Sequence, residues 1–168
     1  NSTGTSANGS RSVAMGSYTP ASGDYSTAMG HDSTASGITS TAMGAGTNAT
    51  GQRSTSMGNY TTASGSMSVA MGYKALAAGD RSVAMGTDTR ASDLNSLVIG
   101  QYNSSGYSVT SADSFSTSAP AFVIGNGTTS NARSDAFKVM FNGDTYVSSS
   151  LYLGGTAITS TAAAVSYT

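Results

Sequence analysis

The residues that could perform acid–base chemistry are few and scattered. The sequence has one His, His31, no Cys, and eight carboxylates, all of them Asp. A general base needs a second group that positions it or receives its proton. His31 follows Gly30 at an expected corner of the chain and has no such partner, so we expect it to be a solvated turn residue. We therefore predict no catalytic residue and no enzymatic activity.

Carboxylates at corners of the chain could also bind calcium, which prefers oxygen ligands. The candidates are Asp24, Asp80, Asp88 and Asp93. The G-G-x-G-x-D pattern of calcium-binding rolls is missing. We predict no metal and no cofactor, and an ion at these corners is the alternative.

A formal match to the dinucleotide-binding pattern G-x-G-x-x-A occurs at Gly44, Gly46 and Ala49. That pattern binds phosphate only where a helix follows and presents its N-terminus. No helix is expected here, so we attribute the match to a Gly-rich repeat.

Composition argues against nucleic-acid and membrane partners. The formal net charge is −1, and the Lys and Arg residues form no run that could neutralise phosphates. No apolar stretch approaches the roughly 20 residues of a membrane span, so we expect no membrane insertion in this segment. The absence of Cys excludes disulfides and is compatible with an extracellular location. We expect Asn1 and Thr168 to be cut ends of a longer chain.

A 14-residue repeat organises the first hundred residues. Met-Gly pairs recur at this spacing, and an Ile-Gly pair closes the series: Met15-Gly16, Met29-Gly30, Met43-Gly44, Met57-Gly58, Met71-Gly72, Met85-Gly86 and Ile99-Gly100. A second series lies between them, Gly9, Gly23, Gly37, Gly51, Gly65 and Gly79, until Asp93 occupies the slot. Each unit has two seven-residue halves, S-x-A-M-G-x-x and T-x-A-S-G-x-x. Such regularity indicates a solenoid.

A seven-residue period also suits a coiled coil, but the chemistry does not. Every half ends in Gly, and Ser, Thr and Gly are poor helix formers. Five alternating residues followed by a two-residue corner fit a short strand better. Two strands per turn predict an all-β fold, a flattened parallel β-roll solenoid of 14-residue coils.

Alternation along each strand assigns the side chains to two faces. Ser, Ala and Gly of the first half, and Thr, Ala and Gly of the second, are expected to point inward and to let the two sheets approach closely. The outward face of the first half carries a β-branched residue beside each Met. The outward face of the second half is mostly polar, from Thr34 and Ser36 to Arg90 and Ser92, and is expected to meet water.

Stacked coils would align the outward Met residues into an apolar ladder about 25–30 Å long. A contiguous exposed apolar patch marks an interaction surface, so we predict self-association through it. The predicted interface residues are Val13, Met15, Met29, Met43, Met57, Val69, Met71, Val83, Met85 and Ile99. The alternative is that Met fills a wide core within one chain, which would turn Ser, Ala and Gly outward.

Residues 10–100 resemble the YadA-type head repeat of trimeric adhesins, through the S-V-A-M-G phrases at 12–16 and 82–86. The family pattern is roughly N-S-V-A-I-G followed by S-x-A-x-G. The resemblance implies a left-handed roll, three identical chains side by side, and V and I positions that face the three-fold axis. Here Met replaces the usual Ile, and Thr27, Thr41 and Thr55 replace Val, which is expected to weaken the interface in the middle coils.

The pattern changes after the repeats. The segment A-F-V-I-G-N-G at 121–127 resembles the first half of the repeat and predicts another strand. Apolar and mixed residues alternate over 134–141, and Asn142-Gly143 follows, which predicts a hairpin. We predict β-roll head repeats over 1–103, a Ser/Thr-rich insertion or loop over 104–120, and an interlocked β connector over 121–168. The last region resembles segments of phage and large-virus tail fibres.

These patterns predict a homotrimeric, non-enzymatic fibre or adhesin segment that mediates attachment to host or other surfaces. The expected partners are two further copies of the chain and a host-surface glycan or protein. The expected location is extracellular, on a virion tail fibre or a bacterial cell surface, and the resemblance of residues 119–163 to fibre connectors favours a virus or phage.

Three alternatives stay open at this point. The chain could be the head of a bacterial trimeric autotransporter adhesin, or a purely structural spacer. Arrays of Thr and Ser could instead bind ice, although Pro20, Asn48, Leu76 and Arg90 interrupt the regular Thr ladder that ice binding requires.

Overall fold

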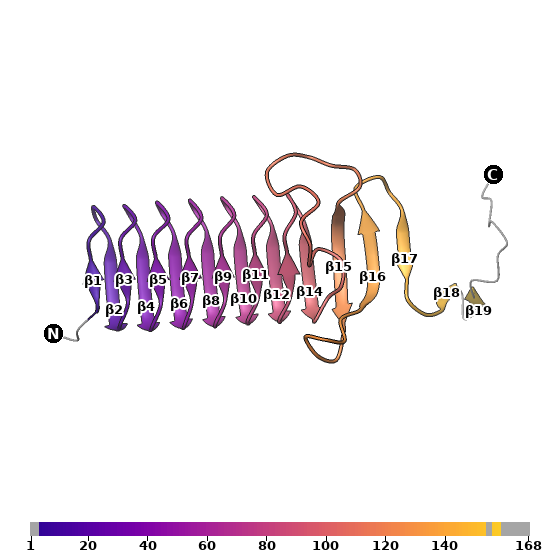
Figure 1. The fold of residues 1–168 in the computed structure, drawn as a ribbon, viewed down its shortest axis with the longest axis horizontal. Coiled ribbons are helices and arrows are strands. Elements are labelled where there is room, and N and C mark those ends of the chain that lie inside the picture. Colours follow the sequence, from indigo (N-terminus) through magenta and orange to yellow (C-terminus); the bar gives the residue numbers. More distant parts are fainter. Residues whose placement is uncertain (1–3, 154–155, 159–168) are drawn as a thin grey trace.

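The computed structural model describes residues 4–153 and 156–158, which form an all-β structure without a helix (Figure 1). Long and short strands alternate along the chain, one of each per 14-residue coil, and the strands stand side by side along the long axis. The predicted parallel β-solenoid is confirmed. Nowhere in the described ranges is there a helix long and apolar enough to cross a membrane.

The first half of each coil forms a five-residue strand. These long strands are β2 (Val13–Ser17), β4 (Thr27–His31), β6 (Thr41–Ala45), β8 (Thr55–Asn59), β10 (Val69–Tyr73), β12 (Val83–Thr87) and β14 (Leu97–Gln101). Neighbours pair in parallel and in register, so Ala28 pairs with Ala42 and Met29 with Met43. Identical positions of successive coils therefore lie next to one another.

The second half of each coil forms a strand of only two residues. These short strands are β1 (Ser6–Ala7), β3 (Pro20–Ala21), β5 (Thr34–Ala35), β7 (Asn48–Ala49), β9 (Thr62–Ala63), β11 (Leu76–Ala77) and β13 (Arg90–Ala91). The prediction of five residues was wrong here. The N–H groups of Ser36 and Gly37 both donate to the carbonyl oxygen of Ala49, at 3.0 and 3.2 Å, so the regular ladder ends at the corner.

Small side chains fill the space between the two sheets. Ala42 of a long strand and Ala35 and Ala49 of short strands are fully buried. The Ser and Thr residues that precede the strands, such as Ser40 and Thr47, are buried as well. The predicted inward face of Ser, Thr and Ala is confirmed. Because these side chains bury little apolar area, the main-chain hydrogen bonds between coils contribute a large share of the cohesion.

The two glycine series lie in different places. Gly37 is buried, and a Cβ there would lie 2.0 Å from the carbonyl oxygen of Gly51. The alternation also predicts an inward Gly30, and this was wrong. Gly30 is exposed and has a φ of 114°, a conformation that side chains rarely adopt. The chain turns at this residue, so the inward–outward alternation ends with Met29.

Beyond the coils, the long-strand sheet continues through β15 (Pro120–Asn126), β16 (Asp135–Met140) and β17 (Thr145–Val147), which makes it ten-stranded. β15 pairs in parallel with β14, and β16 and β17 follow antiparallel. The hairpin expected at Asn142-Gly143 is confirmed: the N–H of Gly143, at a φ of 94°, donates to the carbonyl oxygen of Met140 at 3.0 Å. A separate antiparallel pair comprises β18 (Leu151–Leu153) and β19 (Thr156–Ile158).

The short-strand sheet is shorter, because it has seven strands and ends at β13. The last short strand, β13, packs against β12 and β14, and no further short strand follows it to pack against β14 and β15. The buried position that is Ala84 in β12 becomes Val98 in β14 and Val123 in β15, both fully buried. The larger side chains fill space that the next short strand occupies in the earlier coils, and Gly106 of the loop between β14 and β15 lies close to the Val98 side chain.

Candidate functional site

The ten predicted interface residues lie together on the outer face of the long-strand sheet. Met and Ile side chains of successive coils form one column, and Val, Thr or Leu side chains two residues earlier form a second. We call these two columns the methionine face. It comprises Met15, Met29, Met43, Met57, Met71, Met85 and Ile99 in one column and Val13, Thr27, Thr41, Thr55, Val69, Val83 and Leu97 in the other. Neighbouring strands are about 4.8 Å apart, so each column is continuous.

The methionine face lies outside the core of the chain. Met15, Val13 and Met85 are 55%, 46% and 40% exposed. The other predicted interface residues are half-buried, each partly covered by its neighbours on the adjacent coils. The alternative in which Met fills the core of one chain is excluded, because Ala and Ser occupy that space.

The two broad sides of the solenoid differ in polarity. No position of the methionine face carries a charged side chain. The outward positions of the short strands instead include Thr34, Asn48, Thr62 and Arg90. One side is therefore apolar and the other is mostly polar.

The loop between β14 and β15 is held against the last coils by buried side chains. Asp93 is fully buried, and its Oδ1 accepts hydrogen bonds from the N–H groups of Thr110 and Ser111 at 2.5 and 2.7 Å. Asn103 accepts a bond from the N–H of Arg90 at 2.8 Å and donates to the Arg90 carbonyl oxygen at 2.9 Å. The loop covers this coil, and so Ser92, which was predicted to face water, is only 5% exposed.

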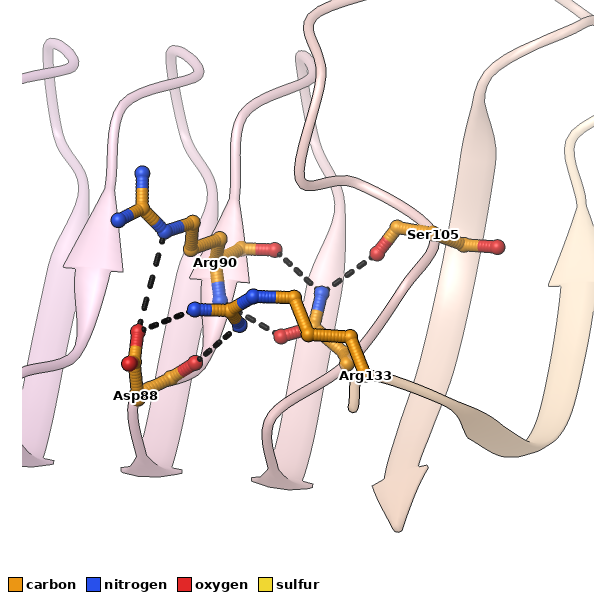
Figure 2. A network of polar contacts seen from close by, with 5 residues as sticks. Asp88, Arg90, Ser105 and Arg133 are labelled. Atoms are coloured by element: carbon orange, nitrogen blue, oxygen red, sulfur yellow. Dashed lines mark hydrogen bonds and ion pairs between the residues drawn. The ribbon is translucent and has the colours of Figure 1, made fainter. Parts of the chain in front are cut away.

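An ion-pair network joins the segment between β15 and β16 to the same coils (Figure 2). Arg133 Nη2 lies 2.8 Å from Asp88 Oδ1, and Arg133 Nη1 donates to the Asp88 carbonyl oxygen at 3.0 Å. The guanidinium carbons of Arg90 and Arg133 lie 4.5 and 4.6 Å from the centre of the Tyr107 ring. The ring is thus in contact with two cations, and the network fastens three separate parts of the chain together.

An open depression of about 440 Å³ lies beside this network. Its lining consists mainly of hydroxyl side chains, including Ser105, Ser108 and Thr110, together with Tyr107 and Arg133. The Arg133 guanidinium is already paired with Asp88. The depression therefore presents hydrogen-bonding groups and no uncompensated charge from this arginine.

Groups with catalytic or metal-binding potential are dispersed. His31 is exposed at the end of β4, with its ring centre 6.3 Å from that of Tyr18. Asp24 and Asp80 each accept a main-chain hydrogen bond of 2.8 Å from the preceding coil. Among the residues that the structure describes, no group of three or more His, Cys, Asp or Glu side chains could hold a metal ion.

Sequence reasoning identified the methionine face and missed the network. Asp93 occupies the place of the repeated Gly, and this departure from the repeat indicated that the last corner differs from the others. Nothing in the repeat indicated that Arg133 would pair with Asp88, since the two residues are 45 positions apart.

Comparison with known families agrees with the repeat. A model of the YadA head domain repeat matches residues 3–19, 21–47, 35–61, 49–75, 63–89 and 77–103, which together cover more than half of the chain. No curated protein matches the chain.

Proposed function

This chain belongs to the YadA head domain repeat family, and we propose on that premise that it is a homotrimeric, non-enzymatic segment of an extracellular attachment fibre. The methionine face is the proposed contact between the three chains. Two further copies of the chain are the proposed partners.

The observation that carries this proposal is the unbroken apolar column on the outside of a single chain. Met side chains pair in register from Met15 to Met85, and Ile99 continues the column. Exposure of a continuous apolar surface to water is unfavourable. Association of identical chains around an axis brings the same face of each chain inward and removes it from water.

Attachment is the proposed role of the outer surfaces of such a trimer. Three identical copies along one rod present each surface feature three times. Once one copy binds a host glycan or protein, the other copies are held at a high effective concentration near the same surface, so several weak contacts together give stable attachment. A structural spacer, which would project a different tip, is the competing function. Binding of the isolated trimer to glycan arrays or host cells supports the adhesin, and equal binding of an unrelated fibre of the same length supports the spacer.

The source of the fibre is a separate proposal. The resemblance of residues 119–163 to fibre connectors favours a phage or viral tail fibre, and a bacterial trimeric autotransporter adhesin is the alternative. The continuation of the gene discriminates between them. Apolar heptads followed by amphipathic strands of about ten residues indicate the bacterial protein.

Sedimentation equilibrium tests the trimer directly. A chain of 16.6 kDa is expected to sediment at three times that mass. Met43→Asp removes an apolar contact worth about 1.5–3 kcal/mol per chain and places three carboxylates near one axis, so it is expected to yield monomers. Ser36→Asp, on the exposed opposite side, is the matched control and is expected to leave the trimer intact. A Met43→Asp variant that stays trimeric and equally heat-resistant contradicts the assignment of this face.

A further inference from the structure

The apolar columns do not end with the family-matched coils. β14 pairs with β15 so that Leu97 lies beside Phe122 and Ile99 beside Ile124. β15 pairs with β16 so that Phe122 lies beside Val139 and Ile124 beside Phe137. Directly paired residues of neighbouring strands point to the same face of a sheet. Four apolar side chains of β15 and β16 therefore extend the methionine face.

The opposite face of the same strands confirms this orientation. Val123, which lies between Phe122 and Ile124, is fully buried against the core. Its partner on β16 is Lys138, and the partner of Lys138 on β17 is Tyr146. The Lys138 Nζ lies 4.5 Å from the centre of the Tyr146 ring. The charged side chain in the middle of β16 is thus turned away from the apolar face.

The extension is continuous and carries larger side chains than the middle coils. The seven long strands of the repeats span about 29 Å, and the addition of β15 and β16 lengthens the face to about 38 Å. Phe122 and Phe137 lie side by side with ring centres 6.0 Å apart, where the middle coils have Thr beside Met. All four added side chains are half-exposed in the single chain.

We propose that Phe122, Ile124, Phe137 and Val139 belong to the contact between identical chains, so that β15 and β16 pack against the same residues of two further copies. The inference rests on the proposed function, because it extends the same trimer contact. The continuity of the sheet indicates that another copy of the chain covers these four residues. Ile124 is one strand spacing from Ile99 in an unbroken sheet with no charge on this face, so the surface that covers Ile99 also reaches Ile124. The C-terminal strands would then be a working part of the interface and not only a connector.

Cysteine cross-linking in the full chain tests this placement. The chain has no Cys, so one introduced thiol can be linked only to the same residue of another copy. Three single variants are compared: Phe137→Cys in the extension, Ile99→Cys in the repeats, and Tyr146→Cys on the opposite face. Tyr146 is 51% exposed, which makes it a reactive control. Each variant is treated at low protein concentration with a bifunctional maleimide that has a short spacer, and covalent dimers are measured on denaturing gels.

The inference predicts that Phe137→Cys and Ile99→Cys give similar yields of covalent dimer, both at least tenfold above Tyr146→Cys. A high yield for Ile99→Cys with only the control yield for Phe137→Cys overturns the inference and leaves the proposed trimer intact. A monomeric mass for the wild-type chain, with no linkage of any variant, overturns both. Sedimentation of each variant without the reagent confirms that the substitution itself has not changed the assembly.

Discussion

Ala42 shows how a single residue position limits what the coil can contain. Its place in the repeat is taken by Ala in most coils and by Ser56 in β8, where the hydroxyl lies 2.8 Å from that of Thr61. Val appears at this place only in β14 and β15, where no short strand follows β13. The allowed size is therefore set by the distance to the opposite sheet, and dense interiors tolerate added volume poorly.

Ala42→Leu is accordingly expected to destabilise the chain. The larger side chain has no room between β6 and the short strands, and overpacking of this kind costs about 1–3 kcal/mol. Chemical denaturation monitored by circular dichroism measures the loss. Asn48→Leu is the matched control, because Leu76 already occupies the equivalent outward position two coils further on, and it is expected to change stability by less than about 0.5 kcal/mol. Equal stability of Ala42→Leu and wild type would show that the two sheets can separate.

The loop between β14 and β15 is the element that departs most from the repeat. It contains no strand over residues 102–119, yet Asp93, Asn103 and Asp135 bind its main-chain groups. Gly106 lies close to the side chain of Val98, so the loop packs where the short-strand sheet has ended. The contacts of the loop replace those that a further coil would make. The ion pair between Arg133 and Asp88 helps to hold the loop in place, because Arg133 also contacts the Tyr107 ring.

Arg133→Ala is expected to release this loop. The paired side chains are only 11% and 13% exposed, and loss of one partner of a buried pair costs about 3 kcal/mol. Local opening should increase chymotrypsin cleavage after Tyr107 by at least about tenfold. Arg81→Ala, an exposed arginine at a corner, is the control and should leave cleavage unchanged. Unchanged cleavage in Arg133→Ala would mean that the main-chain contacts hold the loop without the ion pair.

For the whole molecule, association and folding are coupled in our proposal. The single chain buries mostly Ala, Ser and Thr, while the Met side chains of the repeats lie on the outside along the methionine face. A solenoid of this composition gains much of its apolar burial only when copies meet. Stability is therefore expected to rise with protein concentration.

The trimer is also expected to be insensitive to salt. The methionine face carries no charge, so ionic strength has little to screen there. Between about 0.01 M and about 1 M sodium chloride the Debye length falls from about 30 Å to about 3 Å. We expect the sedimenting mass to stay constant over this range, while the midpoint of thermal unfolding rises with chain concentration. Dissociation at either end of the salt range would point to contacts through the charged corners.

The sequence by itself determined the period, the strand character and the two faces of each long strand. Those features depend on local alternation and on small side chains, which recur at the same place in every coil. Only the tertiary structure decided that the short strands have two residues, that Gly30 faces outward, and that Ile124 follows Ile99 in the same column. It also brought Arg133 to Asp88. The first two outcomes depend on main-chain hydrogen bonds between neighbouring coils, such as those from Ser36 and Gly37 to Ala49. The last two depend on where the chain returns after residues 102–119, and that path is set by packing between distant segments, which no local pattern contains.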